Sequence, residues 1–169
     1  MRPIFKAGIV LVLILAALYV AASFTTPGFN RPPAPAPTPS APIAKYTLTI
    51  DGATFHVDLA TTPAEQEQGL GGRASLAPDS GMLFEFDIPA SYPFWMKDMQ
   101  FPLDFIWIDA TGHIAGVTEN VDPQIGASDS ELKLYTPPVP VTKILEVNAG
   151  TVKLIGAKVG DPVEPLASH

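Results

Sequence analysis

The residue types in this chain that are best suited to chemistry stand together in the segment PFWMKDMQFPLDFIWID, residues 93–109. This segment places Trp95, Lys97 and Asp104 among phenylalanines, methionines and isoleucines. Polar groups that converge on aromatic walls are typical of ligand pockets, and an exposed tryptophan can stack on a glycan or a peptide. The segment therefore supports two hypotheses: a core strand that carries some polar residues, or one wall of a binding or catalytic site.

Pro102 divides the segment into two parts. From residue 103 onward both alternating sets of side chains are largely apolar, which predicts a central strand that is covered on both faces. Asp104 is the exception, because a buried carboxylate must be paired, hydrogen-bonded or protonated. Lys97 and Arg73 are its candidate partners. Asp104 is thus expected either to pair inside the domain or to line a pocket together with Trp95.

These considerations define a set of candidate ligand-binding residues. The set comprises Arg73, Trp95, Met96, Lys97 and Asp104. A hydrolase that uses Asp104 or Glu119 with Lys97 is the enzymatic alternative, and a structural or accessory domain is a third interpretation. The chain has no cysteine and no G-x-S-x-G motif, and its internal histidines fall at positions expected to be exposed, so no catalytic residue is assigned.

Three methionines, Met82, Met96 and Met99, fall within eighteen residues of each other. Thioether ligands select Cu(I), so copper handling is a weaker alternative function. Methionine is also a common gap-filler in cores. Met96 and Met99 are three residues apart, which would place them on opposite faces of a strand, so core packing is favoured. No motif predicts a zinc or calcium site or a cofactor.

The N-terminal 42 residues differ in composition from the rest of the chain. Arg2 and Lys6 precede the uncharged stretch Ala7–Phe24, which fits a signal anchor or a cleaved signal peptide over residues 1–24. The proline-rich residues 25–42 cannot form a core and predict an extended linker. Such a spacer suits a tether, so we expect a domain held to the membrane outside the cytoplasm, or a secreted domain if the segment is cleaved.

The net charge of the globular part excludes one class of partner. Residues 41–169 hold seven basic and seventeen acidic side chains, a net charge of −10. An acidic domain lacks the electrostatic surface that nucleic acid requires. The expected partners are the membrane, through the N-terminal helix, and a small ligand, a glycan or an envelope protein.

Residues 43–169 carry the signals of a globular domain. Asp51-Gly52 suits a tight hairpin turn between two strands, and Thr62-Pro63-Ala64-Glu65 is a capping box that opens a short helix. Further strands are expected at MLFEF, LDFIWID, HIAGVTEN and TKILEVN. Asn148 could cap a second helix over residues 149–155. The glycines of LGGR, residues 70–73, either end the first helix or form a small anion-binding nest.

These elements predict a mostly β domain, barrel-like or sandwich-like, with two short helices. The chain also carries, in order, the motifs TPAEQEQGLGGR, SGMLFEF, FWMKDMQFPLDFIWID and LEVNAGTVKLIGAKVGD. In this series it resembles the domain-of-unknown-function 192 family over about 115 residues.

The resemblance implies a compact, mostly β domain, often carried behind an export signal, and it implies no established activity. Two departures stand out. Family members often carry methionine where this chain has Gly71, and many carry cysteines in the loop that here reads DPQIGASDSELKLYTPP. A redox or thiolate-metal role therefore has no support in this chain.

Overall fold

The computed structural model describes residues 45–166. The expected signal segment, residues 1–24, and the expected linker, residues 25–42, lie outside the described residues. Within the part of the chain that is described, no helix is long and apolar enough to span a membrane.

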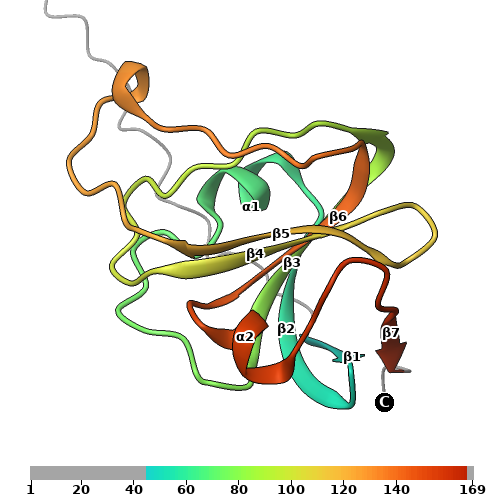
Figure 1. Cartoon of the computed structure of the whole chain (residues 1–169). Coiled ribbons are helices and arrows are strands. Elements are labelled where there is room, and N and C mark those ends of the chain that lie inside the picture. The colour runs from blue at the N-terminus through green and yellow to red at the C-terminus, as the bar shows by residue number, and fades with distance from the viewer. Residues whose placement is uncertain (1–44, 167–169) are drawn as a thin grey trace, which may run out of the picture. The chain divides into compact units, whose positions relative to one another are not determined.

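Seven strands form a single sheet in the order β5-β4-β6-β3-β2-β1-β7 (Figure 1). In chain order the elements are β1 (Lys45–Ile50), β2 (Ala53–Ala60), α1 (Pro63–Gln68), β3 (Ser80–Ala90), β4 (Leu103–Ile108), β5 (Ile114–Val121), the 3-10 turn η1 (Asp129–Glu131), β6 (Val141–Asn148), α2 (Thr151–Ile155) and β7 (Val163–Leu166). The prediction of a mostly β domain with two short helices is confirmed.

The predicted hairpin turn and the predicted helix cap are both present in the structure. Asp51 and Gly52 both have positive φ, 49° and 78°, as a tight hairpin turn between β1 and β2 requires. At α1 the Thr62 side chain accepts a hydrogen bond from the Glu65 backbone N–H, and the Glu65 carboxylate accepts one from the Thr62 N–H. The N-cap of α2 is Gly150, so the prediction that Asn148 caps this helix is wrong.

The connection from β2 to β3 is the main feature that local signals do not reveal. β2 and β3 pair in parallel, with α1 and the following loop as the crossover, whereas the other strand pairs are antiparallel. β3 also continues beyond the expected MLFEF to Ala90, with a register irregularity between Glu85 and Ala90.

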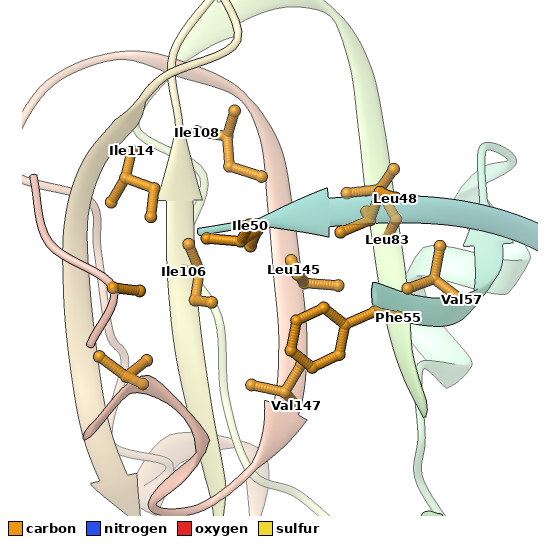
Figure 2. Packing of buried hydrophobic residues seen from close by; sticks show 12 residues of the cluster. Leu48, Ile50, Phe55, Val57, Leu83, Ile106, Ile108, Ile114, Leu145 and Val147 are labelled. Atoms are coloured by element: carbon orange, nitrogen blue, oxygen red, sulfur yellow. The ribbon is translucent and has the colours of Figure 1, made fainter. Parts of the chain in front are cut away.

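The sheet curls into a half-barrel around an inner core. The inner cluster unites side chains from β1, such as Leu48 and Ile50, with Ile106 of β4 and Ile114 of β5, although β1 lies four positions from β4 in the sheet. Figure 2 shows these side chains converging from opposite strands. The segment before β7 extends this closure, since the Gly160 N–H donates to the Ile114 carbonyl at 2.8 Å.

The outer face of the sheet carries a second apolar cluster, which loops and α1 cover. Phe84, Phe105 and Trp107 point to this face and are at most 1% exposed. α1 and α2 lie on opposite sides of the sheet (Figure 1), and Val152 of α2 belongs to the inner cluster. The outer face is therefore the face on which loop residues can form a site.

Candidate functional site

Asp104 is fully buried, and its partners are not those expected. Its two carboxylate oxygens accept the backbone N–H groups of Asn120 at 2.8 Å and Val152 at 2.9 Å. It shares the inner face with Ile106, whereas the pocket described below lies on the outer face. The prediction that Lys97 or Arg73 pairs with Asp104 is wrong, because backbone donors from β5 and α2 already satisfy it.

Arg73 and the LGGR segment are structural. The Arg73 guanidinium forms an ion pair with Asp58 of β2 at 2.8 Å. The N–H groups of Gly71 and Gly72 donate to the carbonyls of Gln68 and Asp98. Because these amides already have acceptors, they form no nest for an anion. α1 ends at Gln68 with Gly69 as its C-cap, so of the three expected helix-ending glycines Gly69 has this role, whereas Gly71 and Gly72 lie in the turn that follows.

Met96 and Met99 lie in a turn of the loop between β3 and β4, and the Met99 N–H donates to the Met96 carbonyl at 3.3 Å. Both side chains are at most 4% exposed and join Met82 in the outer cluster. The expectation that they occupy opposite faces of a strand is wrong, since this part of the loop is not a strand. Their burial among aromatic rings fits core packing.

A pocket of about 400 Å³ opens on the outer face, between α1 and the loop that follows β3. Its aromatic walls are Phe84, Phe86, Tyr92, Phe94 and Trp95. Neighbouring rings hold one another in place: Phe86 stacks on Tyr92 at 3.7 Å between centroids, and Phe94 meets Phe84 edge-on at 4.9 Å. We call this the aromatic pocket; its walls are held together by these ring contacts.

Backbone pairing fixes the loop that carries these rings. Phe94 exchanges two backbone hydrogen bonds of 2.8 Å with Tyr135. The Gln124 N–H donates to the Met96 carbonyl at 2.9 Å. Residues 91–101 are therefore held against the segment between β5 and β6, and Trp95 is held at the pocket wall.

A second, more polar hollow of about 520 Å³ adjoins the first. The two share the residues Glu67, Gln68, Gly71, Trp95 and Lys97. The Lys97 ammonium forms an ion pair with Asp129 at 2.5 Å, and this hydrogen bond is the main cause of the raised pKa of Lys97. We call this the polar hollow; Trp95 and Lys97 stand between it and the aromatic pocket.

Glu146 of β6 is the polar group of the aromatic pocket that sequence reasoning did not identify. It is 4% exposed, lines the pocket, and has no hydrogen-bond partner within residues 45–166. Its neighbours on the flanking strands are Met82 and Phe105, both fully buried. Burial raises the pKa of Glu146 to about 8, because desolvation disfavours the carboxylate and no donor offsets it.

A sequence signal for Glu146 does exist. In TKILEVN it is the single acid, and its neighbours Ile144, Leu145 and Val147 are apolar residues of both faces of the strand. The same reasoning singled out Asp104 in β4. The two carboxylates differ in what faces them, and the residue types of the strands do not reveal that difference.

The structure brings together some of the predicted residues. Trp95 and Lys97 line the pocket wall together and are partly exposed. Met96 packs beneath them, while Arg73 and Asp104 lie outside the residues that line the two cavities. Glu119 is exposed on β5 and lines neither cavity.

The fold and the pocket together define a small half-barrel domain with an aromatic cavity on its outer face. Residues 46–165 match the family model DUF192, described as Uncharacterized ACR, COG1430. The chain belongs to this family. None of the curated protein sequences matches it.

Two solved structures are similar to this chain. A protein from Sinorhizobium meliloti 1021, described as a candidate transcription regulator, is 38% identical, with 73% of this chain and 95% of that chain covered and a TM-score of 0.66. A protein of unknown function from Novosphingobium aromaticivorans DSM 12444 is 30% identical, with 78% and 92% covered and a TM-score of 0.67.

Proposed function

We propose that this protein is a ligand-binding module that holds a small molecule, or an extended portion of a larger one, in the aromatic pocket. The observation that carries the proposal is the pocket itself, which has a volume of about 400 Å³ and is walled by five aromatic side chains. Ligand sites in proteins are typically concave, mostly apolar cavities of this size with a few polar groups that set orientation. Lys97 and Glu146 are those polar groups.

The arrangement of the two cavities favours a ligand longer than the aromatic pocket. Trp95 and Lys97 border both the pocket and the polar hollow, so a ligand that enters one can continue into the other. Trp95 is partly exposed, whereas Trp107 is 1% exposed and has its indole N–H bonded to Thr118 at 2.9 Å. Trp95 is therefore the tryptophan available to stack on a ligand.

The residues of the enzymatic alternative are not assembled. Asp104 is buried on the inner face, Glu119 is exposed on β5, and Lys97 pairs with Asp129. The proposed binding module therefore needs none of the groups that the hydrolase hypothesis invoked, apart from Lys97 as a contact residue.

In this proposal, residues 1–42 anchor the domain to the membrane and place it outside the cytoplasm. The basic residues Arg2 and Lys6 ahead of an uncharged apolar stretch support an anchor whose amino end stays in the cytoplasm. An extended proline-rich spacer of this length would hold the domain roughly 50 Å from the membrane. A binding module on such a tether can reach ligands of the cell envelope.

Ligand-observed NMR with a mixed panel tests the binding function. The panel comprises neutral oligosaccharides, short peptides and small aliphatic amines. We expect at least one of these classes to bind the full-length chain, Trp95→Ala to abolish that binding, and Glu164→Gln to leave it unchanged, because Glu164 is exposed on β7 and lines neither cavity. No binding by any class, or binding that survives in a folded Trp95→Ala variant, would overturn the proposal.

A further inference from the structure

The pocket contains one polar group whose bonding capacity is unused. The Glu146 carboxyl group is nineteen-twentieths buried or more, faces the aromatic pocket, and accepts no hydrogen bond from residues 45–166. None of the fully enclosed side-chain oxygen or nitrogen atoms in the described residues lacks a hydrogen-bond partner, so the Glu146 carboxyl oxygens reach the open space of the pocket. A ligand that supplies a donor there would form a hydrogen bond that residues 45–166 do not supply, within an apolar site where such bonds are strong.

The aromatic walls favour a cation as that donor. The face of an aromatic ring is electronegative, and tryptophan, tyrosine and phenylalanine all attract ammonium or guanidinium groups in desolvated sites. Tyr92, Phe94 and Trp95 line the same cavity as Glu146. An anionic ligand would face the electronegative faces of these rings.

The charges around the site point the same way. Glu67 of α1 and Lys97 of the covering loop are the other charged residues that line the aromatic pocket, and Asp98 and Asp129 join them in the polar hollow. Lys97 is already engaged with Asp129. On the strand side, the residues that flank Glu146 are Met82 and Phe105, so no cation from the sheet neutralises it.

We propose that the ligand of the aromatic pocket carries a positively charged nitrogen on an aliphatic stem, as in a lysine side chain, and that Glu146 binds this nitrogen. The inference rests on the proposed binding function and specifies its ligand class. The ammonium group lies at the carboxylate and the stem lies along the rings of Phe94 and Trp95. The rest of the ligand extends past Lys97 into the polar hollow, whose Glu67 and Asp98 suit further positive charge.

Proton exchange accompanies this binding. Burial raises the pKa of Glu146 to about 8, so this side chain is mostly protonated at pH 7 unless a cation pairs with it. An alkylammonium group keeps its own proton, with a pKa of about 10.4. Binding then converts the Glu146 acid to a carboxylate and releases one proton to the buffer. The affinity should rise about tenfold per pH unit well below pH 8 and level off above it.

The test compares two probes on the full-length chain, purified in a non-ionic detergent. Nα-acetyl-lysine methylamide carries the ammonium group, and Nα-acetyl-norleucine methylamide has a similar stem without it. In calorimetry at pH 8, the lysine probe should bind at least about tenfold more tightly than the norleucine probe. Across pH 6 to 9, the affinity for the lysine probe should rise from pH 6 to 8 and then level off. Measurements at pH 7 in buffers of different ionisation heat should report close to one proton released.

Matched variants assign the effect to Glu146. Glu146→Gln should fold, because glutamine has nearly the same size and shape and carries no proton whose loss is opposed by burial, and it should lose both the preference for the lysine probe and the pH dependence. Glu164→Gln should retain both. Equal binding of the two probes, abolished by Trp95→Ala, would overturn the inference and leave the binding function standing. Lysine binding that persists unchanged in Glu146→Gln would also overturn the inference.

Failure of both probes, with another class of the NMR panel bound at Trp95, would again overturn only the ligand class. Failure of both probes and of the entire panel would overturn the ligand class and the binding function together. The two proposals therefore fail in distinguishable ways.

Discussion

At the scale of single residues, Asp104 and Glu146 are buried carboxylates on adjacent strands of one sheet. Asp104 faces inward and receives two backbone N–H groups. Glu146 faces outward into a cavity, with Met82 and Phe105 beside it. The two neighbouring acids thus differ in their surroundings: Asp104 holds backbone N–H groups in place, and Glu146 lines a cavity, where we propose that it binds a ligand.

We expect Asp104→Asn to lower the free energy of unfolding by about 2–4 kcal/mol. An asparagine can accept one of the two N–H bonds, but its amide would then present a donor to the other N–H. The lost bonds matter because Asn120 lies near an irregularity of β5 with φ of 52°, and Val152 lies in the first turn of α2. Urea unfolding measures the change.

The matched control is Asp79→Asn, which alters an exposed aspartate with no hydrogen bond from its side chain among the described residues. Its effect should stay within about 0.5 kcal/mol. A loss of similar size in both variants would contradict the structural role of Asp104.

Glu146 should make stability depend on pH. Below its usual pKa of 4.5, the carboxyl group is protonated in both the folded and the unfolded state. As the pH rises from 4.5 to about 8, the unfolded chain loses this proton and the folded domain keeps it. The free energy of unfolding should therefore fall with pH, by at most about 1.4 kcal/mol per unit, and level off above pH 8.

The comparison of wild type with Glu146→Gln isolates this effect from other titrating groups. In urea unfolding, the free energy of unfolding of Glu146→Gln should rise progressively relative to that of the wild type between pH 5 and 8, because the glutamine amide has no proton to lose. Parallel stability curves for the two proteins would show that the Glu146 pKa is close to normal.

At the scale of elements, α1 forms one side of the aromatic pocket despite its six residues. Such a short helix depends on its ends. The capping box supplies the hydrogen bonds between Thr62 and Glu65, and the Gln66 side chain ties the helix to the Glu85 carbonyl at 2.8 Å. Backbone N–H donors of Thr61 and Thr62 lower the pKa of Glu65, so this cap is strongest above the usual pKa of glutamate.

Thr62→Ala should therefore lower the free energy of unfolding by about 1 kcal/mol, as removal of an N-cap hydroxyl generally does. Thr62→Ser retains the hydroxyl and should recover most of the loss. Thermal or urea unfolding of the three proteins gives the comparison. Equal destabilisation by alanine and serine would assign the effect to packing of the threonine methyl group instead of the cap.

Elements with local signals were predictable from the sequence, because the residues that determine them are close neighbours in the chain. The Asp51-Gly52 turn, the Thr62 cap and the doubly covered strand at residues 103–108 are of this kind. The parallel pairing of β2 with β3 was not predictable, since it depends on a crossover that no short motif encodes.

The candidate site also contains residues that the sequence revealed and others that it did not. The alternation of residue types correctly indicated that Asp104 needs partners, yet those partners are backbone groups of Asn120 and Val152, which have no sequence signature. Trp95 and Lys97 were recognisable as unusual residues for a packing segment. Glu146 lies about fifty residues further on, and only the register of β6 between β3 and β4 brings it to the same cavity.

At the scale of the whole molecule, the half-barrel separates the residues that close the sheet from those of the proposed binding site. The inner cluster joins strands from both halves of the sheet, whereas the outer face supports loops and α1 around two cavities. Substitutions at the rim of the two cavities should therefore leave the closure of the sheet undisturbed. If the proposed binding function holds, loop residues can set the ligand while the inner cluster keeps the fold.

The proposed tether gives the last prediction. The full-length chain, expressed in bacteria, should sediment with membranes and resist alkaline washing, because residues 7–24 carry no charge and are long enough to insert. A chain that starts at residue 43 should remain in the supernatant, and protease added to spheroplasts should reach the domain of the full-length protein. Mass spectrometry separates the alternatives: an intact N-terminus in the membrane supports the anchor, whereas loss of about the first 23 residues indicates a cleaved signal peptide. Full-length protein in the cytoplasmic supernatant would contradict export altogether, and the envelope ligand with it.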